Sequence, residues 1–342
     1  MKNSLLVAAG LSVMLTASAS AQGLTSPICT SGGSQAQNVA QDACQQAYDV
    51  FQFMAPQLGL ALAGGNATLG QGSSLGGLGH FSVGVRGNVF NGVIPQIDQF
   101  TQRTTGASPS RTLQSKDQIL GLPTADAAIG LFAGLPFGLT NVGGVDVLVS
   151  ASYVPTIGDG NKDFSLKPKQ NLQLGYGVRV GLLSESIVVP GLAVTYLKRD
   201  LPSTTISGST SYTSALGATT ASLSIADAEV KTSAIRIVAS KSLIFFGFAA
   251  GVGQDTYSQS ANISATVNST LGGSTTTTVP NAFPDIKRTN YFFDASLNLP
   301  LFKVVGEVGQ VTGGTVNTFN PIGSSRADRS LTYGSVGLRL SL

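Results

Sequence analysis

The sequence predicts an all-β fold: an antiparallel transmembrane β-barrel of about ten strands (range about 8–14), preceded by an N-terminal helix and a glycine-rich segment. Three observations support it: a leader-like N-terminus, apolar and polar residues that alternate along many segments, and connections that are long and short in turn. No stretch beyond the leader holds the roughly 18 consecutive apolar residues of a membrane-spanning helix, so the chain would cross a membrane with strands. The expected parts are a signal peptide at 1–21, a cap or plug segment at 22–79 and the barrel at 80–342.

The first residues have the pattern of a cleaved secretory signal peptide. Lys2 supplies the positive charge, residues 5–15 form the apolar core, and Ala19-Ser20-Ala21 is an A-x-A cleavage site. An uncleaved membrane helix is the weaker alternative, because the apolar core is shorter than the about 20 residues that span a bilayer. The mature chain is therefore expected to begin near Gln22.

Both cysteines of the chain, Cys29 and Cys44, lie near the expected mature N-terminus. In an oxidising periplasm they should form a disulfide, and closing a loop of about 15 residues would stabilise the segment by about 3 kcal/mol. The alternative is a lipidated N-terminal cysteine. It conflicts with the cleavage site, because Cys29 lies several residues beyond it.

Alternation with a period of two residues predicts the individual strands. The clearest segment is 170–183, where apolar side chains at every even position from 172 to 182 oppose Gln, Gly and Arg. Equally regular segments lie at 80–90, 144–154 and 288–299. Weaker ones lie at 125–135, 188–200, 230–241, 243–258, 302–312 and 330–342.

The connections between these segments are alternately long and short along the chain. Short ones follow the even-numbered strands, and long ones, rich in Gly, Ser, Thr, Asn and Asp, follow the odd-numbered strands, at 91–124, 155–169, 201–229, 259–287 and 313–329. Outer-membrane barrels have short periplasmic turns and long outer loops, and an even strand count returns the C-terminus to the periplasm. A secreted β-sandwich, the main alternative, has no reason to sort its loops in this way. Alternation within 203–228 and 259–284 predicts hairpins that project beyond the bilayer.

Charged residues within the strands fall on the face opposite the apolar one. If the apolar face contacts lipid, these charges point into the lumen, where they have two interpretations: a closed interior of paired charges, or a polar pore whose charges set selectivity. The predicted lumen-facing charges are Arg86, Asp146, Arg179, Arg236, Asp294, Glu307 and Arg339.

The chain stops at the end of an alternating strand. Its last eight residues resemble the β-signal by which bacterial outer-membrane proteins are handed to the barrel-assembly machinery, a polar residue, a glycine and two hydrophobic residues at fixed spacing. Ser335, Gly337, Leu340 and Leu342 occupy these places, with Leu where many such proteins end in an aromatic residue. The resemblance implies contact with that machinery during biogenesis.

Helical periodicity replaces alternation from about Ser34 to Met54, with Ser34 as the expected N-cap and Pro56 just past the end. A glycine-rich stretch, Gly59 to Gly79, follows. Because a whole helix fits poorly inside about ten strands, we expect a cap at the periplasmic mouth, or partial entry there, rather than a full plug.

A plug ahead of a barrel, together with the Gly-Gly-Asn-Ala run at Gly64–Ala67, resembles the fatty-acid-transporter family of outer-membrane channels. The resemblance implies an N-terminal hatch and conduction of hydrophobic molecules. The chain lacks the family's Asn-Pro-Ala motif and is short for the family's larger barrel. No binding residue is carried over.

Composition argues against catalysis and cofactors. The chain has one histidine, His80, so a metal cluster lacks its ligands and a Ser-His-Asp site could be built only around this residue, whose place at the start of the first strand is that of an ordinary rim histidine. No phosphate-binding loop is present. Charged residues make up 11% of the chain and the net charge is +3, without the clustered Lys and Arg of a nucleic-acid binder. We therefore expect a passive channel or uptake pore for small solutes, hydrophobic ones among them, in outer-membrane lipid. The alternative is a non-conducting structural or surface-interaction protein.

Overall fold

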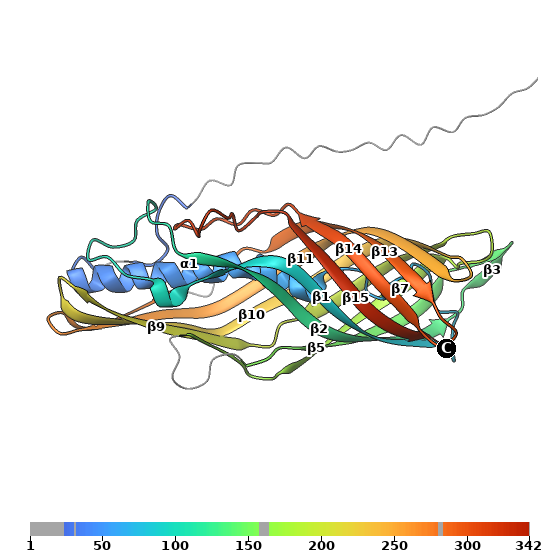
Figure 1. Cartoon of the computed structure of the whole chain (residues 1–342), viewed down its shortest axis with the longest axis horizontal. Helices are drawn as coiled ribbons and strands as arrows, with labels where there is room; N and C mark the ends of the chain where they lie inside the picture. Colours follow the sequence, from blue (N-terminus) through green and yellow to red (C-terminus); the bar gives the residue numbers. More distant parts are fainter. Residues whose placement is uncertain (1–23, 31, 157–163, 280–282, 342) are drawn as a thin grey trace, which may run out of the picture.

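The computed structural model describes residues 24–30, 32–156, 164–279 and 283–341. The predicted signal peptide and the last β-signal residue, Leu342, lie outside these residues. Within them, ten antiparallel strands form a closed barrel, as the sequence predicts (Figure 1). The ten are β1 (Phe81–Pro95), β2 (Ser115–Phe132), β5 (Gly144–Tyr153), β7 (Leu172–Leu183), β8 (Gly191–Asp200), β10 (Gly217–Ser242), β11 (Phe246–Ser269), β13 (Ile286–Asn298), β14 (Lys303–Thr312) and β15 (Leu331–Ser341).

The barrel closes between its first and last strands. β1 pairs with β15 from Ser82↔Ser341 to Phe90↔Tyr333, and each further neighbour is joined in the same antiparallel manner. Backbone hydrogen bonds therefore run around the whole described wall, which leaves no unpaired edge between the ten strands.

The outer surface of the barrel is apolar. In β7, Leu174 and Val178 are exposed while Arg179 is buried in the interior, so the alternation seen in the sequence separates the two faces. Similar exposed apolar residues lie on β1, β11, β13 and β15. Among the described residues, no helix combines the length and apolarity needed to cross a bilayer.

The two ends of the barrel differ. At the short-turn end, brief connections join β7 to β8, β10 to β11 and β13 to β14, and a small hairpin of β3 (Leu135–Phe137) and β4 (Thr140–Val142) links β2 to β5. The C-terminal strand also ends there (Figure 1). The opposite, long-connection end carries 96–114, with the 3-10 helix η1 (Ile97–Gln99), and 313–330.

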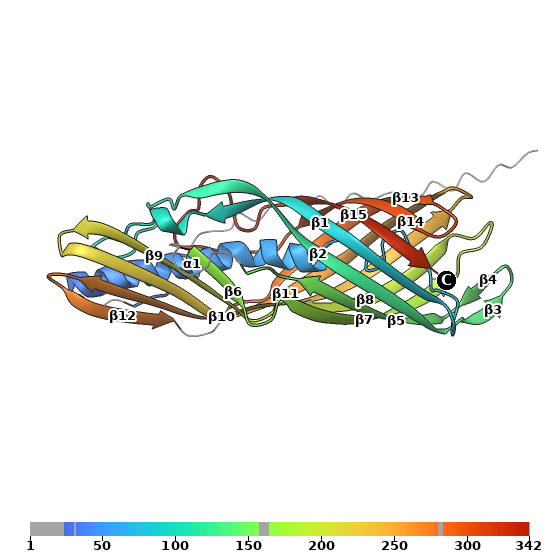
Figure 2. The same cartoon turned by 60° about the horizontal axis from the view of Figure 1, so that its bottom comes forward.

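Two hairpins lengthen the barrel at the long-connection end. β9 (Thr204–Ser214) pairs with the start of β10, and β12 (Gly273–Val279) pairs with the end of β11. β6 (Phe164–Pro168) adds a further strand beside β9. We call β6, β9, β12 and the paired halves of β10 and β11 the extension (Figure 2). The hairpins that the sequence predicts at 203–228 and 259–284 are present in it.

Several strands are longer than their alternation suggests. β2 begins at Ser115, not near 125, because it stays paired with β1 as far as Pro95↔Ser115, so the first long connection is shorter than expected. Its early part carries Lys116 and Asp117, which interrupt the apolar pattern that the sequence prediction relied on. The extra length of β1, β2, β10 and β11 builds the long-connection end.

Helix α1 (Gln35–Ala63) begins where expected. Ser34 is its N-cap, and a capping box joins the Ser34 and Gln37 side chains to each other's backbone amides. The expected end before Pro56 is wrong, because the helix continues through this proline to Ala63. Most side chains of the helix are buried, so tertiary packing outweighs the cost of about 3 kcal/mol that an interior proline brings.

The helix lies inside the extension, against β10, β11 and β12, and its last turn enters the barrel (Figures 1 and 2). The sequence predicts the helix at the mouth formed by the short turns; that place is wrong, because the helix lies at the long-connection end and enters the barrel partially from there. The sequence argument considered only the bore of a ten-stranded cylinder. The extension supplies a second enclosure that holds the helix without widening that bore, and close packing such as Gly59 on the Tyr257 ring fills it.

Candidate functional site

The interior of the barrel is occupied by residues 64–79, which we call the lumen segment. It starts at the end of α1 near the middle of the barrel and ends beside His80, the residue before β1, at the short-turn end. Along this path Asn66 contacts Glu307 of β14, Leu69 contacts Arg339 of β15, and Leu75 contacts Asp146 of β5. The segment therefore lies along the bore.

Arginines of the wall donate hydrogen bonds to backbone carbonyls at the end of α1 and in the lumen segment. Arg199 Nη1 lies 3.2 Å from the Leu62 oxygen, and Arg236 Nη2 donates to the Ala63 oxygen. The last carbonyls of a helix lack intrahelical partners and carry a partial negative charge. Two buried guanidinium groups satisfy them here, which fixes the end of α1 inside the barrel.

Further along the segment the same chemistry recurs. Arg86 Nη1 donates to the Asn66 oxygen at 2.6 Å, and Arg339 Nη1 donates to the Leu69 oxygen at 2.6 Å. A hydrogen bond from a charged donor contributes about 1.5–3 kcal/mol. These contacts hold the segment against β1 and β15, the two strands that close the barrel.

Carboxylates of the wall accept hydrogen bonds from the backbone amides of the segment. Glu307 Oε2 accepts from the Asn66 amide at 2.6 Å. Asp294 Oδ2 accepts from the Gly70 amide at 2.8 Å and from Asn66 Nδ2 at 2.9 Å. The Leu75 amide donates to both oxygens of Asp146, at 3.1 and 3.2 Å. Side chains of the wall therefore form hydrogen bonds with both the carbonyl oxygens and the amide groups of the lumen segment.

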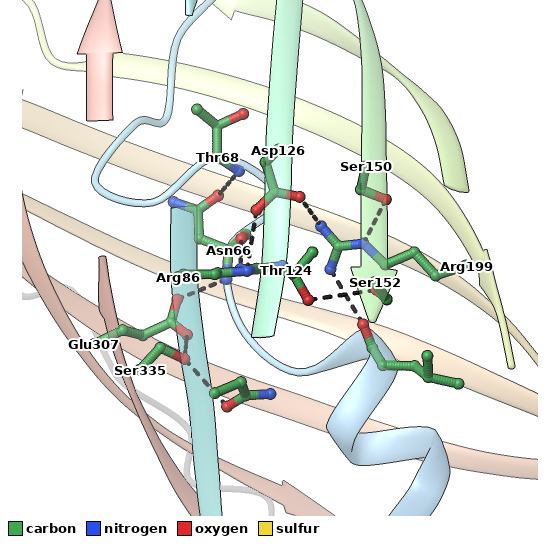
Figure 3. A network of polar contacts seen from close by, with 12 residues as sticks. Asn66, Thr68, Arg86, Thr124, Asp126, Ser150, Ser152, Arg199, Glu307 and Ser335 are labelled. Carbon is green, nitrogen blue, oxygen red and sulfur yellow. Dashed lines mark hydrogen bonds and ion pairs between the residues drawn. The ribbon is translucent and has the colours of Figure 1, made fainter. Parts of the chain in front are cut away.

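Ion pairs between wall residues balance most of these charges, and Figure 3 shows the two that Asp126 forms. Asp126 bridges two arginines, with 3.1 Å to Arg86 Nε and 2.6 Å to Arg199 Nη2. Arg179 pairs with Asp146 at 2.8 Å. Arg236 pairs with Asp255 at 3.0 Å. Buried charges need such partners, because removing one member of a pair leaves the other desolvated at a cost of about 3–5 kcal/mol.

Glycines in the strands make room for the lumen segment. A Cβ atom at Gly181 would lie 2.7 Å from Ser74 Oγ, and one at Gly191 would lie 2.7 Å from Ser73 Cβ. A Cβ atom at Gly337 would lie 2.6 Å from Leu69 Cδ1. These distances are shorter than real Cβ contacts, so the wall accommodates the segment where side chains would otherwise fill a narrow barrel.

All seven charges that the sequence assigns to the lumen are buried in the barrel. Six of them contact the end of α1 or the lumen segment directly, and Arg179 does so through Asp146. The sequence analysis missed Asp126, Arg199 and Asp255. Each lies on the inner face of a strand, and the alternation of Ala125 and Ala127 around Asp126 would have identified at least that residue.

The remaining predicted residues have different places. The disulfide between Cys29 and Cys44 is present and ties the described N-terminus to α1. Ser335 is buried and donates to Asn88 Oδ1, Gly337 packs against Leu69, and Leu340 is exposed on the apolar face. His80 lies exposed at the short-turn end.

Space beside the segment is small. A cavity of about 20 Å³ lies between Leu69, Ser82, Arg86 and Asp126, far below the roughly 300 Å³ of a small-molecule site. Across the residues that the structure describes, no three His, Cys, Asp or Glu side chains come together as a metal site.

No protein-family model matches the chain, and no curated protein matches it in sequence. Among solved structures it is similar to the outer membrane protease OmpT from Escherichia coli, at 7% identity and a TM-score of 0.32, over 77% of this chain and 94% of the other. The toluene transporter TodX from Pseudomonas putida aligns at 11% identity and a TM-score of 0.30, over 80% and 96%. The transport unit of the autotransporter AIDA-I from Escherichia coli aligns at 9% and 0.28, over 88% and 99%.

Likeness at this level assigns no activity to the chain. A closed antiparallel barrel with an apolar outer surface and a polar interior is the architecture of bacterial outer-membrane proteins.

Proposed function

We propose that this protein is an outer-membrane channel for small polar solutes, closed in the present conformation by its lumen segment. The observation that carries the proposal is the way the segment is held: charged wall residues accept hydrogen bonds from, or donate them to, the backbone of an uncharged, glycine-rich chain. When the segment moves, water replaces these bonds, and each charge-assisted bond then costs only its net contribution of about 1.5–3 kcal/mol.

The glycines of the wall support the same conclusion. A permanently closed barrel of this size has room to fill its bore with its own side chains. Here Gly181, Gly191 and Gly337 face the segment instead. Movement of the segment would therefore leave an aqueous passage, lined by these glycines and by charged residues.

The lining favours polar solutes over hydrophobic ones. Around the segment the buried wall groups include Arg86, Arg339, Asp294 and Glu307, which an apolar molecule would desolvate without forming hydrogen bonds. Polar solutes replace the contacts that water and the segment make with these groups. The conduction of hydrophobic molecules that the family resemblance implies finds no support in this lining.

A non-conducting structural protein is the second candidate. The ion pairs Arg179–Asp146 and Arg236–Asp255 favour it, because a sealed narrow interior also needs paired charges. The deep burial of α1 in the extension favours it as well, since the helix holds one end of the segment in place.

Conductance across planar bilayers separates the two candidates. In the variant S74C/G181C the two Cβ atoms would start 2.9 Å apart, so the segment must move outward by about 1 Å to reach the Cβ separation of about 3.8 Å at which a disulfide joins it to β7. We expect single-channel openings from the wild type, none from the oxidised variant, and their return on reduction. Wild type in the same reducing agent is the control, because its own Cys29–Cys44 bridge is also exposed to it. Silence from the wild type and from the reduced variant alike would favour the structural protein.

A further inference from the structure

The chain ahead of β1 extends along the whole length of the barrel. The Leu24 amide donates to the Thr318 oxygen in the 313–330 connection, at the long-connection end. Asp49 of α1 accepts from the Phe319 and Asn320 amides of the same connection. At the other extreme, Gly77 of the lumen segment packs against Ala133 near the end of β2, at the short-turn end. The polypeptide thus enters β1 from the end opposite to its helix.

Loop lengths orient this path in a membrane. In outer-membrane barrels the short turns face the periplasm and the long connections face outward. With that orientation, α1 and the disulfide that precedes it lie on the outer side, while β1 starts on the periplasmic side. The lumen segment is the covalent link between them.

We propose that the barrel displays its own N-terminal segment, residues 24–63, on the outer face of the membrane, with the link to β1 running through the lumen. This inference rests on the proposed outer-membrane location and orientation, and it holds whether or not the barrel conducts solutes. The closed wall supports it, because the paired strands leave no lateral path by which the link could lie outside the bore.

Contacts at the outer end retain the displayed segment. Asp42 accepts a hydrogen bond from the Arg103 amide at 2.8 Å, and Arg111 Nη1 lies 3.7 Å from the same carboxylate. Tyr48 stacks on the Phe283 ring, and Phe51 contacts the same ring edge-to-face. The Cys29–Cys44 bridge and the Gln45 side chain, which accepts from the Ile28 amide, fold the residues before α1 back onto the helix. The segment is therefore part of a folded unit and not a loose tail.

Epitope insertion tests the display. One variant carries the epitope between Ser26 and Pro27, near exposed residues of the N-terminal segment. A second carries it after Leu271, at the exposed tip of the β11–β12 hairpin, and a third after Ile187, in the exposed turn between β7 and β8. Antibody binding is measured on intact and on permeabilised cells, and heat-modifiable migration on gels verifies that each tagged barrel has assembled.

We expect the Ser26 and Leu271 tags to bind antibody on intact cells to the same extent, and the Ile187 tag to bind only after permeabilisation. Binding of the Leu271 tag but not of the Ser26 tag on intact cells would overturn the display while leaving the orientation in place. The reverse pattern, with only the Ile187 tag accessible, would overturn the orientation itself. Neither outcome depends on conductance.

A second measurement covers the case in which the Ser26 insertion blocks assembly. Oxidation of S74C/G181C in cells should join the lumen segment to β7 and shift the migration of the unheated protein. S74C alone is the matched control. If the double variant assembles but the shift does not occur, the segment does not lie beside β7 in the bore, and the proposed link through the lumen is wrong.

Discussion

Arg339 of the last strand donates a hydrogen bond from Nη1 to the backbone oxygen of Leu69, at 2.6 Å, across 270 residues of sequence. The strand that closes the barrel thus also holds the segment that fills it. Both the guanidinium group and the Leu69 side chain are buried, so water does not compete for this contact. Through this hydrogen bond, β15 directly restrains the lumen segment.

Replacing Arg339 with Ala should loosen the lumen segment. The loss of one charge-assisted hydrogen bond, about 1.5–3 kcal/mol, would raise the open probability by about 10- to 100-fold if that bond limits opening. Single-channel recording measures the change. Arg339→Lys is the matched control, because it keeps the positive charge and one donor, and we expect a smaller increase. An unchanged open probability in Arg339→Ala would mean that the contact does not restrain the gate.

The glycines of the wall make a steric prediction. In Gly181→Ala the new Cβ would lie 2.7 Å from Ser74 Oγ, so the segment must shift. We expect the free energy of unfolding to fall by about 1–3 kcal/mol, as overpacking typically causes. Circular dichroism at increasing urea concentration measures it in detergent micelles.

Gly306→Ala is the matched control for this substitution. Gly306 faces outward on β14, and a Cβ atom there meets nothing within 4 Å. Its effect should stay within about 0.5 kcal/mol. Equal destabilisation by both substitutions would show that the loss at Gly181 comes from the strand itself and not from the segment.

The two faces of β7 should respond in opposite ways to charge. Val178→Arg places a charge on the lipid-facing surface at a cost of about 2–4 kcal/mol, so assembly should fall. Arg179→Ala leaves Asp146 with its hydrogen bonds from the Leu75 amide, so the barrel should still assemble, with reduced stability. Heat-modifiable migration on gels measures both. The reverse order of assembly would mean that the faces are assigned wrongly.

The strands could be predicted from sequence because residues that face lipid are apolar, while the alternate residues, which face the lumen, are polar or small. In β7 the alternation continues along nearly the whole strand, and the predicted segment 170–183 differs from Leu172–Leu183 by two residues at its start. In β2 the alternation ends where the strand leaves the apolar part of the barrel surface. Lys116 and Asp117 interrupt the pattern there, so the sequence does not indicate the remaining length of the strand. Alternation therefore predicts where a strand faces lipid, not how far it continues.

The contacts between the barrel wall and the lumen segment were harder to predict, since the residues that meet are distant in sequence. Arg86 and Glu307 could be assigned to the lumen from alternation alone. Their contacts with Asn66 could not, because the lumen segment carries no charge and no periodicity that indicates a partner. The position of α1 was not predictable for the same reason. The helix lies inside the extension, which forms only when β9 pairs with β10 and β12 pairs with β11.

Asp49 gives the extension a pH dependence. Its carboxylate accepts hydrogen bonds from the Phe319 and Asn320 amides, both at 2.8 Å, yet burial raises its pKa to about 7. A carboxyl group whose pKa is higher in the folded state than in the unfolded state, where it is about 3.9, binds its proton more tightly when folded. The stabilisation is therefore complete below about pH 4 and is lost as the pH rises through about 7. Burial also raises the pKa of the neighbouring Asp42, which acts in the same direction.

Urea unfolding at pH 4.5 and at pH 8 tests this. Between about pH 4 and pH 7 the free energy of unfolding should fall by at most about 1.4 kcal/mol per pH unit for one such group. Asp49→Asn does not titrate, so its loss of stability over the same range should be smaller, with the remainder due to Asp42. The substitution also leaves one of three donors, Gln45 Nε2 or a connection amide, without an acceptor, so its stability should be lower than that of the wild type at acidic pH. An equal pH dependence in the two proteins would show that Asp49 stays ionised in the folded state, its hydrogen bonds outweighing the cost of burial.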